Sequence, residues 1–276
     1  MAITAKDVNK LRQMTGAGMM DCKKALVEAD GDFDKAVEIL RKKGQKISAS
    51  RSDRETNEGA VFVKSADDLK EAVLISLNCE TDFVAKNEEF QQAGKSIIEV
   101  AFNEKPANVE ELKQLKVGDL TIEEKLTELV GKIGEKIDIG AYERLSAEMV
   151  VSYIHAGDRL GVLVALENTG GEAEEAGRDI GMQIAAMNPV ALDKDGVDQS
   201  VIDRELEIGR EQARAEGKPD NIIEKIAEGK LNKFYKENTL VNQAYVKDSS
   251  MSVEKYLDSV NKGMKVVAFK RVSVSE

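Results

Sequence analysis

The sequence predicts an α+β fold, in which helical segments accompany two separate sets of strands. Residues 1–44 and 198–238 show only helical spacing of apolar residues, whereas residues 59–145 contain strand-like apolar runs together with helical ones. A similar order of strands and helix returns after residue 145. With 276 residues, of which 42% are hydrophobic, the chain can bury a sizeable core, and its length favours two domains over one.

Residues 1–44 predict three short helices joined by tight turns. Thr4 followed by Asp7 is a weak capping box for the first helix, TGAG separates the first helix from the second, and DGD starts the third. Gly44 is a suitable C-cap for the last helix. Residues 45–58 contain almost nothing apolar, so we expect a mobile linker that tethers this small domain loosely.

Residues 59–145 predict the first half of the core. GAVFVKS and AVLISLNC are strand-like, helices follow, one of them from the capping box TIEE, and KIDIGAYERLS returns to a strand. The second half comprises residues 146–197 and 239–276, and it begins with two strands and a helix. AGKSI at 93–97 and AGRDI at 176–180 share Ala, Gly, a basic residue and Ile in register, a short match that favours an internal duplication.

Residues 198–238 interrupt the second half with a wholly helical segment. Two apolar stripes at helical spacing lie on either side of the break EGKPD. Two such stripes joined by a Gly-Lys-Pro turn predict an antiparallel helical hairpin that projects from the second half. The stripes consist of Ile202, Leu206, Gly209 and Ala213, and of Ile223, Ala227, Leu231 and Phe234.

Composition argues against several functional classes. The net charge of −11 would repel a phosphate backbone, so we expect no direct nucleic-acid partner. No apolar window is long enough to cross a membrane, and MAITAKDVNK lacks the profile of a signal peptide, so the predicted location is the cytoplasm. Cys22, Cys79 and the single His155 cannot build a zinc site or a metal cluster, so no metal and no cofactor are expected.

The sequence contains no recognisable catalytic constellation. GAGMMD and GKS lack the strand context and the glycine spacing of nucleotide-binding loops. A nucleophile and base would have to involve His155, which we interpret first as a structural or turn residue, then as a partner contact, and last as a catalytic base. A protein-binding function fits this sequence better than an enzymatic one.

Two short segments are candidates for protein contacts. Met19 and Met20 are adjacent at a helix start and cannot both face inward, so we expect one in the core and the other at the surface, where methionine suits an adaptable contact. Thr81 can cap a short helical turn that has Asp82 at its positive end. Phe83 then either packs onto the following helix, which the residue types alone favour, or stands exposed as a wedge.

Three segments together resemble bacterial translation elongation factor Ts, namely LRQMTGAGMMDCKKALVEADGDFDKAVEILRKKG, NCETDFVAKNEEF and SYIHAGDRLGVLV. The resemblance extends over essentially the whole chain, and the combination is highly specific. It implies an N-terminal three-helix domain of the ubiquitin-associated-like type, a duplicated core of antiparallel sheets and helices, and an inserted antiparallel coiled coil. It also implies that this chain is a guanine-nucleotide exchange factor for elongation factor Tu. An exchange factor of this kind is not an enzyme.

The resemblance assigns a role to the stretch around Phe83. The family's TDFV motif is matched by Thr81, Asp82, Phe83 and Val84. In the family this motif intrudes near the magnesium site of the nucleotide that is bound to elongation factor Tu. The resemblance therefore implies that Phe83 is an exposed wedge.

Other contacts implied by the resemblance lie far from that motif in the sequence. Arg12, Met19 and Met20 match positions that contact the GTPase domain of elongation factor Tu, and His155 matches a loop that touches another of its domains. Many relatives carry an additional helix after the last strand, whereas this sequence shows none after RVSVSE. Contacts made by that helix are expected to be absent or replaced.

The alternative function is a scaffold or chaperone-like binding module. Its N-terminal bundle would recognise a helical peptide and its hairpin would form a homodimer, without any acceleration of nucleotide release. A homodimer through the hairpin is also compatible with the exchange function. Substitution of Asp82 and Phe83 separates the two functions, because only an exchange factor would lose rate.

Overall fold

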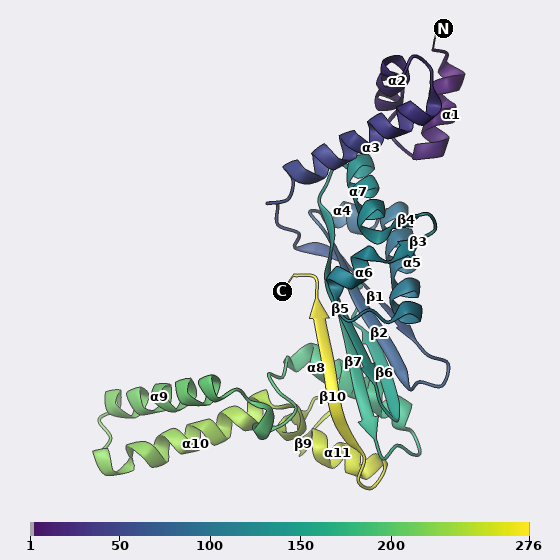
Figure 1. Cartoon of the computed structure of the whole chain (residues 1–276). Helices are drawn as coiled ribbons and strands as arrows, with labels where there is room; N and C mark the ends of the chain where they lie inside the picture. The colour runs from purple at the N-terminus through teal and green to yellow at the C-terminus, as the bar shows by residue number, and fades with distance from the viewer. Residues whose placement is uncertain (1–2, 276) are drawn as a thin grey trace.

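The computed structural model describes residues 3–275 and shows an elongated molecule with three parts (Figure 1). A group of three helices lies at the N-terminal end, two antiparallel sheets with their helices form the middle, and a pair of long helices projects from the opposite end (Figure 1). This mixture of helices and antiparallel sheets confirms the predicted α+β class. Among residues 3–275, no helix is both long enough and apolar enough to span a bilayer.

Three helices, which we call the N-terminal module, surround a small apolar core. They are α1 (Ala5–Thr15), α2 (Met19–Glu28) and α3 (Phe33–Ser50). The capping box is complete, because the Thr4 hydroxyl accepts from the Asp7 amide at 3.2 Å and the Asp7 carboxylate accepts from the Thr4 amide at 3.0 Å. The core consists of Val8, Leu11, Cys22, Ala25, Leu26, Ala29 and Ala36.

Helix α3 extends beyond the end that the sequence predicts. Gly44 is not a C-cap, because the helix continues to Ser50, so the prediction of a linker is wrong for residues 45–50. Gly44 is buried where α3 crosses α7 (Ile122–Ile133), and a Cβ added to Gly131 would come within 2.7 Å of the Gly44 Cα. The two glycines let the helix backbones touch, so the N-terminal module is held to the core by a helix crossing as well as by the chain.

The first sheet has the strand order β1-β2-β5, with both neighbouring pairs antiparallel. An apolar cluster joins the sheet to α5 and α7, and the predicted capping box is present at the start of α7, where Thr121 and Glu124 cap each other. The elements of this half are β1 (Glu58–Ser65), β2 (Glu71–Cys79), α4 (Asp82–Ala85), α5 (Glu88–Glu104), α6 (Val109–Gln114), β3 (Lys116–Val117), β4 (Leu120–Thr121), α7 and β5 (Ile137–Ser146).

The second sheet repeats the topology of the first, with the strand order β10-β7-β6. In each sheet a strand from later in the chain pairs with the second strand of an earlier hairpin. The helices match as well, because Gly94 of α5 lies against Phe62 of β1 and Gly177 of α8 lies against Val151 of β6. This agreement supports the internal duplication. The elements are β6 (Met149–Ile154), β7 (Leu160–Glu167), α8 (Ala173–Met187), β8 (Ala244–Tyr245), β9 (Asp248–Ser252), α11 (Val253–Val260) and β10 (Lys265–Ser273).

The two sheets pack on each other through a shared apolar layer. Gly161 of β7 permits a close approach, since a Cβ added there would come within 2.6 Å of a Val61 methyl carbon on β1. The central strands β2 and β7 are therefore buried along nearly their whole length. The layer consists of Val61, Ala72, Leu74, Val150, Leu163, Ala165, Val272 and Val274.

The predicted helical hairpin is present and projects away from the second sheet (Figure 1). It consists of α9 (Gln199–Ala215) and α10 (Asp220–Asn238), with the 3-10 turns η1 (Lys194–Gly196) and η2 (Leu240–Asn242) on either side. The helices are antiparallel and close together: a Cβ added to Gly209 would lie 2.9 Å from the Ala227 Cα. Across the pair, the Arg210 guanidinium donates to both carboxylate oxygens of Glu224 at 2.8 and 3.1 Å.

The root of the hairpin is held by buried polar side chains. Gln243, which directly follows η2, donates to the Glu237 carbonyl of α10 at 3.0 Å and accepts from Gln183 of α8 at 3.1 Å. One turn earlier on α8, the buried Asp179 carboxylate accepts from the Tyr245 hydroxyl at 2.6 Å. Because buried polar groups left without partners are costly, these bonds favour one direction for the hairpin.

Candidate functional site

The connection between β2 and α5 carries an exposed aromatic side chain. Phe83 is 82% exposed, whereas the neighbouring Val84 is 7% exposed and Phe90 is fully buried. The inward positions are thus filled by Val84 and Phe90. The position that the residue types alone favour for Phe83, packed onto the following helix, is therefore wrong, and the structure has the exposed position that the resemblance implies.

The backbone of this connection explains why Phe83 points outward. Thr81 has an extended conformation and is the N-cap of α4, with its hydroxyl accepting from the Val84 amide at 3.5 Å. The chain therefore passes from strand to helix within two residues. Because Val84 and Ala85 face the core, the preceding residues Asp82 and Phe83 occupy the outer side of the turn. We call residues 81–84 the Thr81 turn.

Asp82 adds a negative charge to the same turn. Its carboxylate accepts from the Lys86 ammonium at 2.8 Å, one helical turn away, and this hydrogen bond lowers the pKa of Asp82. At neutral pH the turn therefore displays an ionised carboxylate beside an exposed ring. The pair could bind a surface that combines a cation with an apolar edge.

The buried Cys79 forms a hydrogen bond to the Thr81 turn. Its thiol lies 3.1 Å from the Thr81 carbonyl oxygen, to which it donates. Burial, together with the nearby Glu135 carboxylate, raises the pKa of Cys79 to about 12. The thiol is therefore neutral at physiological pH and serves as a hydrogen-bond donor to the turn.

Alkylation of Cys79 should be slow in the native protein and fast after unfolding. The unfolded thiol has a pKa of about 8.5, whereas the folded one loses its proton only near pH 12. By linkage, the contribution of Cys79 to the free energy of unfolding is constant at pH values below the pKa of the unfolded thiol. It declines as the pH rises from that pKa to the pKa of the folded thiol. The alkylation rate of Cys79 can be measured with iodoacetamide at pH 8, with and without denaturing urea. Mass spectrometry of the Cys79 peptide gives the extent of labelling. Equal labelling of native and unfolded protein would contradict it.

Arg12, Met19 and Met20 lie at the surface of the N-terminal module. Met19 and Met20 are 48% and 63% exposed, so the expectation that one of them packs in the core is wrong. Cys22 takes the inward position at the start of α2, which leaves both methionines outside. Met14, at the end of α1, is also exposed.

Sequence reasoning missed Met14, although one signal was available. The inward stripe of α1 is complete with Val8 and Leu11, which are its two buried residues. Met14, which directly precedes the last residue of the helix, Thr15, therefore lies outside the buried stripe. The N-terminal module thus has three exposed methionines, a residue type that suits an adaptable contact with a protein partner.

His155 lies in the exposed turn between β6 and β7, on the second sheet. Its backbone amide donates to the Leu160 carbonyl at 2.9 Å, and its Nδ1 lies 3.0 Å from the Tyr153 hydroxyl. These contacts make it a turn residue in the structure. Across the described range 3–275, no three or more His, Cys, Asp or Glu side chains are placed to hold a metal ion.

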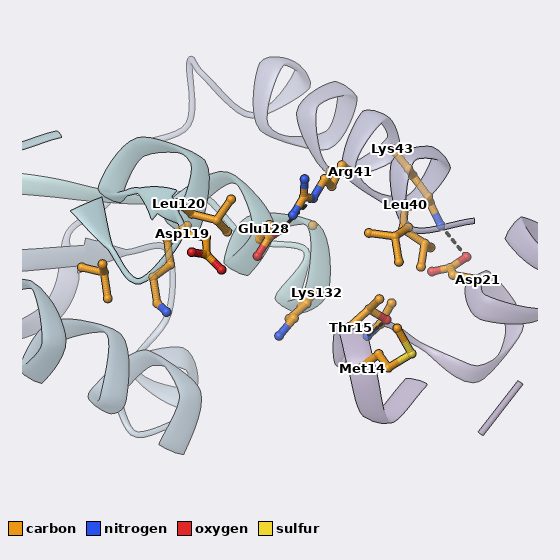
Figure 2. Close-up of a pocket in the computed structure, with 16 residues that line it drawn as sticks. Met14, Thr15, Asp21, Leu40, Arg41, Lys43, Asp119, Leu120, Glu128 and Lys132 are labelled. Carbon is orange, nitrogen blue, oxygen red and sulfur yellow. Dashed lines mark hydrogen bonds and ion pairs between the residues drawn. The ribbon is translucent and has the colours of Figure 1, made fainter. Parts of the chain in front are cut away.

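A cleft of about 450 Å³ separates the N-terminal module from the core (Figure 2). Met14 and Thr15 lie on one side of it and Lys132 on the other, and two ion pairs border it: Lys43 with Asp21, and Arg41 with Glu128 at 3.2 Å. The sequence does not reveal this cleft, because its lining comes from α1, α2, α3, α7 and the β3–β4 hairpin. Gly44 and Gly131, at the crossing of α3 and α7, are also part of its lining.

Comparisons with known proteins identify the family of this chain. The family described as Elongation factor TS matches residues 80–276. The chain is 58% identical to Elongation factor Ts of Amoebophilus asiaticus and 56% identical to that of Cytophaga hutchinsonii, in each case over 275 residues and 99% of both chains. It is 46% identical to Elongation factor Ts of Clostridium perfringens over 265 residues, which are 94% of this chain and 88% of the relative. The chain therefore belongs to the elongation factor Ts family.

Proposed function

We infer from this membership that the chain is a guanine-nucleotide exchange factor for elongation factor Tu and acts in translation elongation. The observation that carries the proposed mechanism is the Thr81 turn, which displays an 82% exposed Phe83 next to an ionised Asp82. In the proposed mechanism the turn inserts near the magnesium and phosphate groups of the bound GDP. The protein forms no covalent bond with the nucleotide and moves no proton.

The size of the effects indicates how the wedge acts. Burial of one Phe side chain contributes about 1.5 to 3 kcal/mol, or roughly one to two decades in an equilibrium constant. That alone is too little to expel a tightly held nucleotide. Magnesium requires nearly ideal octahedral geometry, so a small displacement of its ligands or waters by Asp82 and Phe83 strongly weakens the binding of the cation. Loss of the cation leaves the phosphate charge without compensation.

The rest of the interface must hold elongation factor Tu in its empty state. Linkage makes the effect reciprocal: the factor by which this protein weakens GDP binding is the factor by which GDP weakens the complex. Fresh nucleotide therefore dissociates the complex. The protein accelerates exchange in both directions, and the cellular excess of GTP sets the net direction.

Further contacts are proposed for surfaces outside the Thr81 turn. Arg12, Met19 and Met20 would contact the GTPase domain of elongation factor Tu, and His155 would contact another of its domains. All four side chains are exposed, which such contacts require. The partner is a protein and not a nucleic acid, in keeping with the net charge of −11, and the reaction takes place in the cytoplasm.

The proposal also concerns the division of the chain. The three helices of the N-terminal module would form a ubiquitin-associated-like domain, and residues 59–145 the first half of the core. The second half would comprise 146–197 and 239–276. The hairpin of residues 198–238 would be a coiled coil, and it would form the contact in any homodimer.

Stopped-flow release of a fluorescent GDP from the matching elongation factor Tu tests the function. At a fixed magnesium concentration, the full chain should accelerate release strongly and in proportion to its concentration until saturation. Excess free magnesium should reduce the acceleration, because the wedge acts on the cation. A correctly folded chain that binds elongation factor Tu without accelerating release would contradict the function and favour a scaffold.

A further inference from the structure

A carboxylate from outside the Thr81 turn binds its first residue. Glu135 follows Gly134, the C-cap of α7, whose φ of 85° suits glycine. The Glu135 carboxylate accepts from the Thr81 amide at 3.1 Å and from the Thr81 hydroxyl at 2.9 and 3.1 Å. The residue that caps α4 is thus itself held from the end of α7.

The residue before Thr81 also has a carboxylate that is held by hydrogen bonds. Glu80, with a side chain that is 17% exposed, accepts from the Lys136 amide at 2.6 Å and from the Arg51 guanidinium at 2.7 and 3.0 Å. Burial raises the pKa of Glu80, but the bonds from Lys136 and Arg51 outweigh burial and lower it. Residues 80 and 81 therefore exchange hydrogen bonds with residues 135 and 136.

The same contacts reach the segment that follows α3. Arg51 is the C-cap of α3, and the Lys136 ammonium donates to the carbonyl oxygens of Ser52 at 2.7 Å and of Arg54 at 3.0 Å. The end of the N-terminal module is therefore attached to Glu80, which directly precedes the Thr81 turn, and to Lys136, which follows α7. These are hydrogen bonds between segments that are distant in the chain, so packing of the whole molecule and not local sequence creates them.

We propose that Glu135, Glu80 and Arg51 form a brace whose role is to hold the Thr81 turn with Phe83 exposed, in the conformation that acts on elongation factor Tu. The proposal rests on the exchange function above and names positioning residues for it. None of the three needs to touch the nucleotide. Glu135 acts through Thr81, and Arg51 acts through Glu80.

A short turn with an exposed ring needs such support. Helix α4 has only four residues, and isolated helices of that length are not stable in water. Exposure of the Phe83 ring is itself unfavourable, so an unbraced turn would sample conformations that cover the ring. A turn that must be ordered during binding loses part of the binding energy to that ordering. Because the brace already orders the turn in the free protein, this part of the binding energy is not lost.

Glu135→Ala should therefore lower the exchange rate at saturating concentration by about tenfold, while the half-saturating concentration changes by less than about threefold. Glu135→Gln should recover part of the rate, because its carboxamide oxygen still accepts one of the Thr81 bonds. Glu123→Ala is the matched control: it removes a carboxylate from the other end of α7 that is bonded to Gln114. It should leave the rate unchanged. Thermal melting of each variant confirms that it is folded.

A double-mutant cycle with Phe83→Ala separates positioning from general stability. If Glu135 acts through the Thr81 turn, Glu135→Ala has little further effect once Phe83 is absent. Equal loss of rate in the presence and absence of Phe83 would overturn the proposal, and so would a Glu135→Ala variant as fast as wild type. If Glu135→Ala is unfolded at the assay temperature, Arg51→Leu is used in the same cycle. Failure of the wild type to accelerate release would instead contradict the exchange function.

Discussion

Replacement of Phe83 by alanine is expected to lower the rate of GDP release at saturating concentration by a factor of roughly 10 to 100. The range follows from the apolar surface that the ring can bury on elongation factor Tu. The ring is 82% exposed and contributes little to the core, so the fold should be unaffected. Affinity for the partner should change far less than the rate, because other surfaces supply much of the interface.

The control for Phe83→Ala removes an exposed apolar side chain elsewhere. Val246, 42% exposed in the β8–β9 hairpin, is suitable, and Val246→Ala should exchange nucleotide at the wild-type rate. Stopped-flow release of fluorescent GDP at fixed magnesium measures both variants, and melting temperatures establish that each is folded. If Phe83→Ala accelerates release as strongly as wild type, the exchange activity resides elsewhere on the interface.

Gly131→Val should force α3 away from its crossing with α7 and raise the half-saturating concentration for exchange by about tenfold or more. A Cβ at this position would meet the Gly44 Cα at 2.7 Å, and a backbone atom inside a helix cannot step aside as a side-chain end can. Such overpacking costs about 1 to 3 kcal/mol. The exposed Arg41–Glu128 ion pair cannot compensate, because exposed pairs contribute about 1 kcal/mol or less.

The expected loss in binding comes from position, since Arg12, Met19 and Met20 remain in the chain. Once α3 leaves α7, their surface is no longer held at a defined place relative to the Thr81 turn. Gly229→Val is the matched control: Gly229 lies inside helix α10, and a Cβ there meets nothing within 4 Å. Small-angle scattering should show a larger radius of gyration for Gly131→Val only. Identical scattering and identical concentration dependence for both variants would contradict this role of the crossing.

The fold was predictable where a local pattern has one structural meaning. The capping boxes at Thr4 and Thr121 and the two stripes of the helical hairpin belong to this class. Gly44 does not, because a glycine that ends a helix and a glycine at a helix crossing look the same in sequence. The difference depends on Gly131, which is distant in the chain and close in space.

The candidate site was predictable in its location and not in its support. The capping pattern places Asp82 and Phe83 at a strand-to-helix turn, but the residue types alone favour packing of Phe83 onto the following helix, which is wrong because Val84 and Phe90 fill the inward positions. The resemblance to the family implies the exposed position. Glu135 has no local signal at all, since a glutamate after a helix is ordinary until the fold brings it to Thr81.

Strand β10 also determines when the second sheet can close during protein synthesis. Lys265 pairs with Glu167 and Ser273 with Leu160, and the whole helical hairpin lies between β7 and β10 in the chain. The ribosome must therefore deliver both long helices before β7 gains its second neighbour, whereas the first sheet can form once β5 has emerged. In that interval β7 presents an apolar strand with an unpaired edge, the kind of surface through which nascent chains associate. The hairpin thus makes the second half of the core the more vulnerable one while the chain is being made.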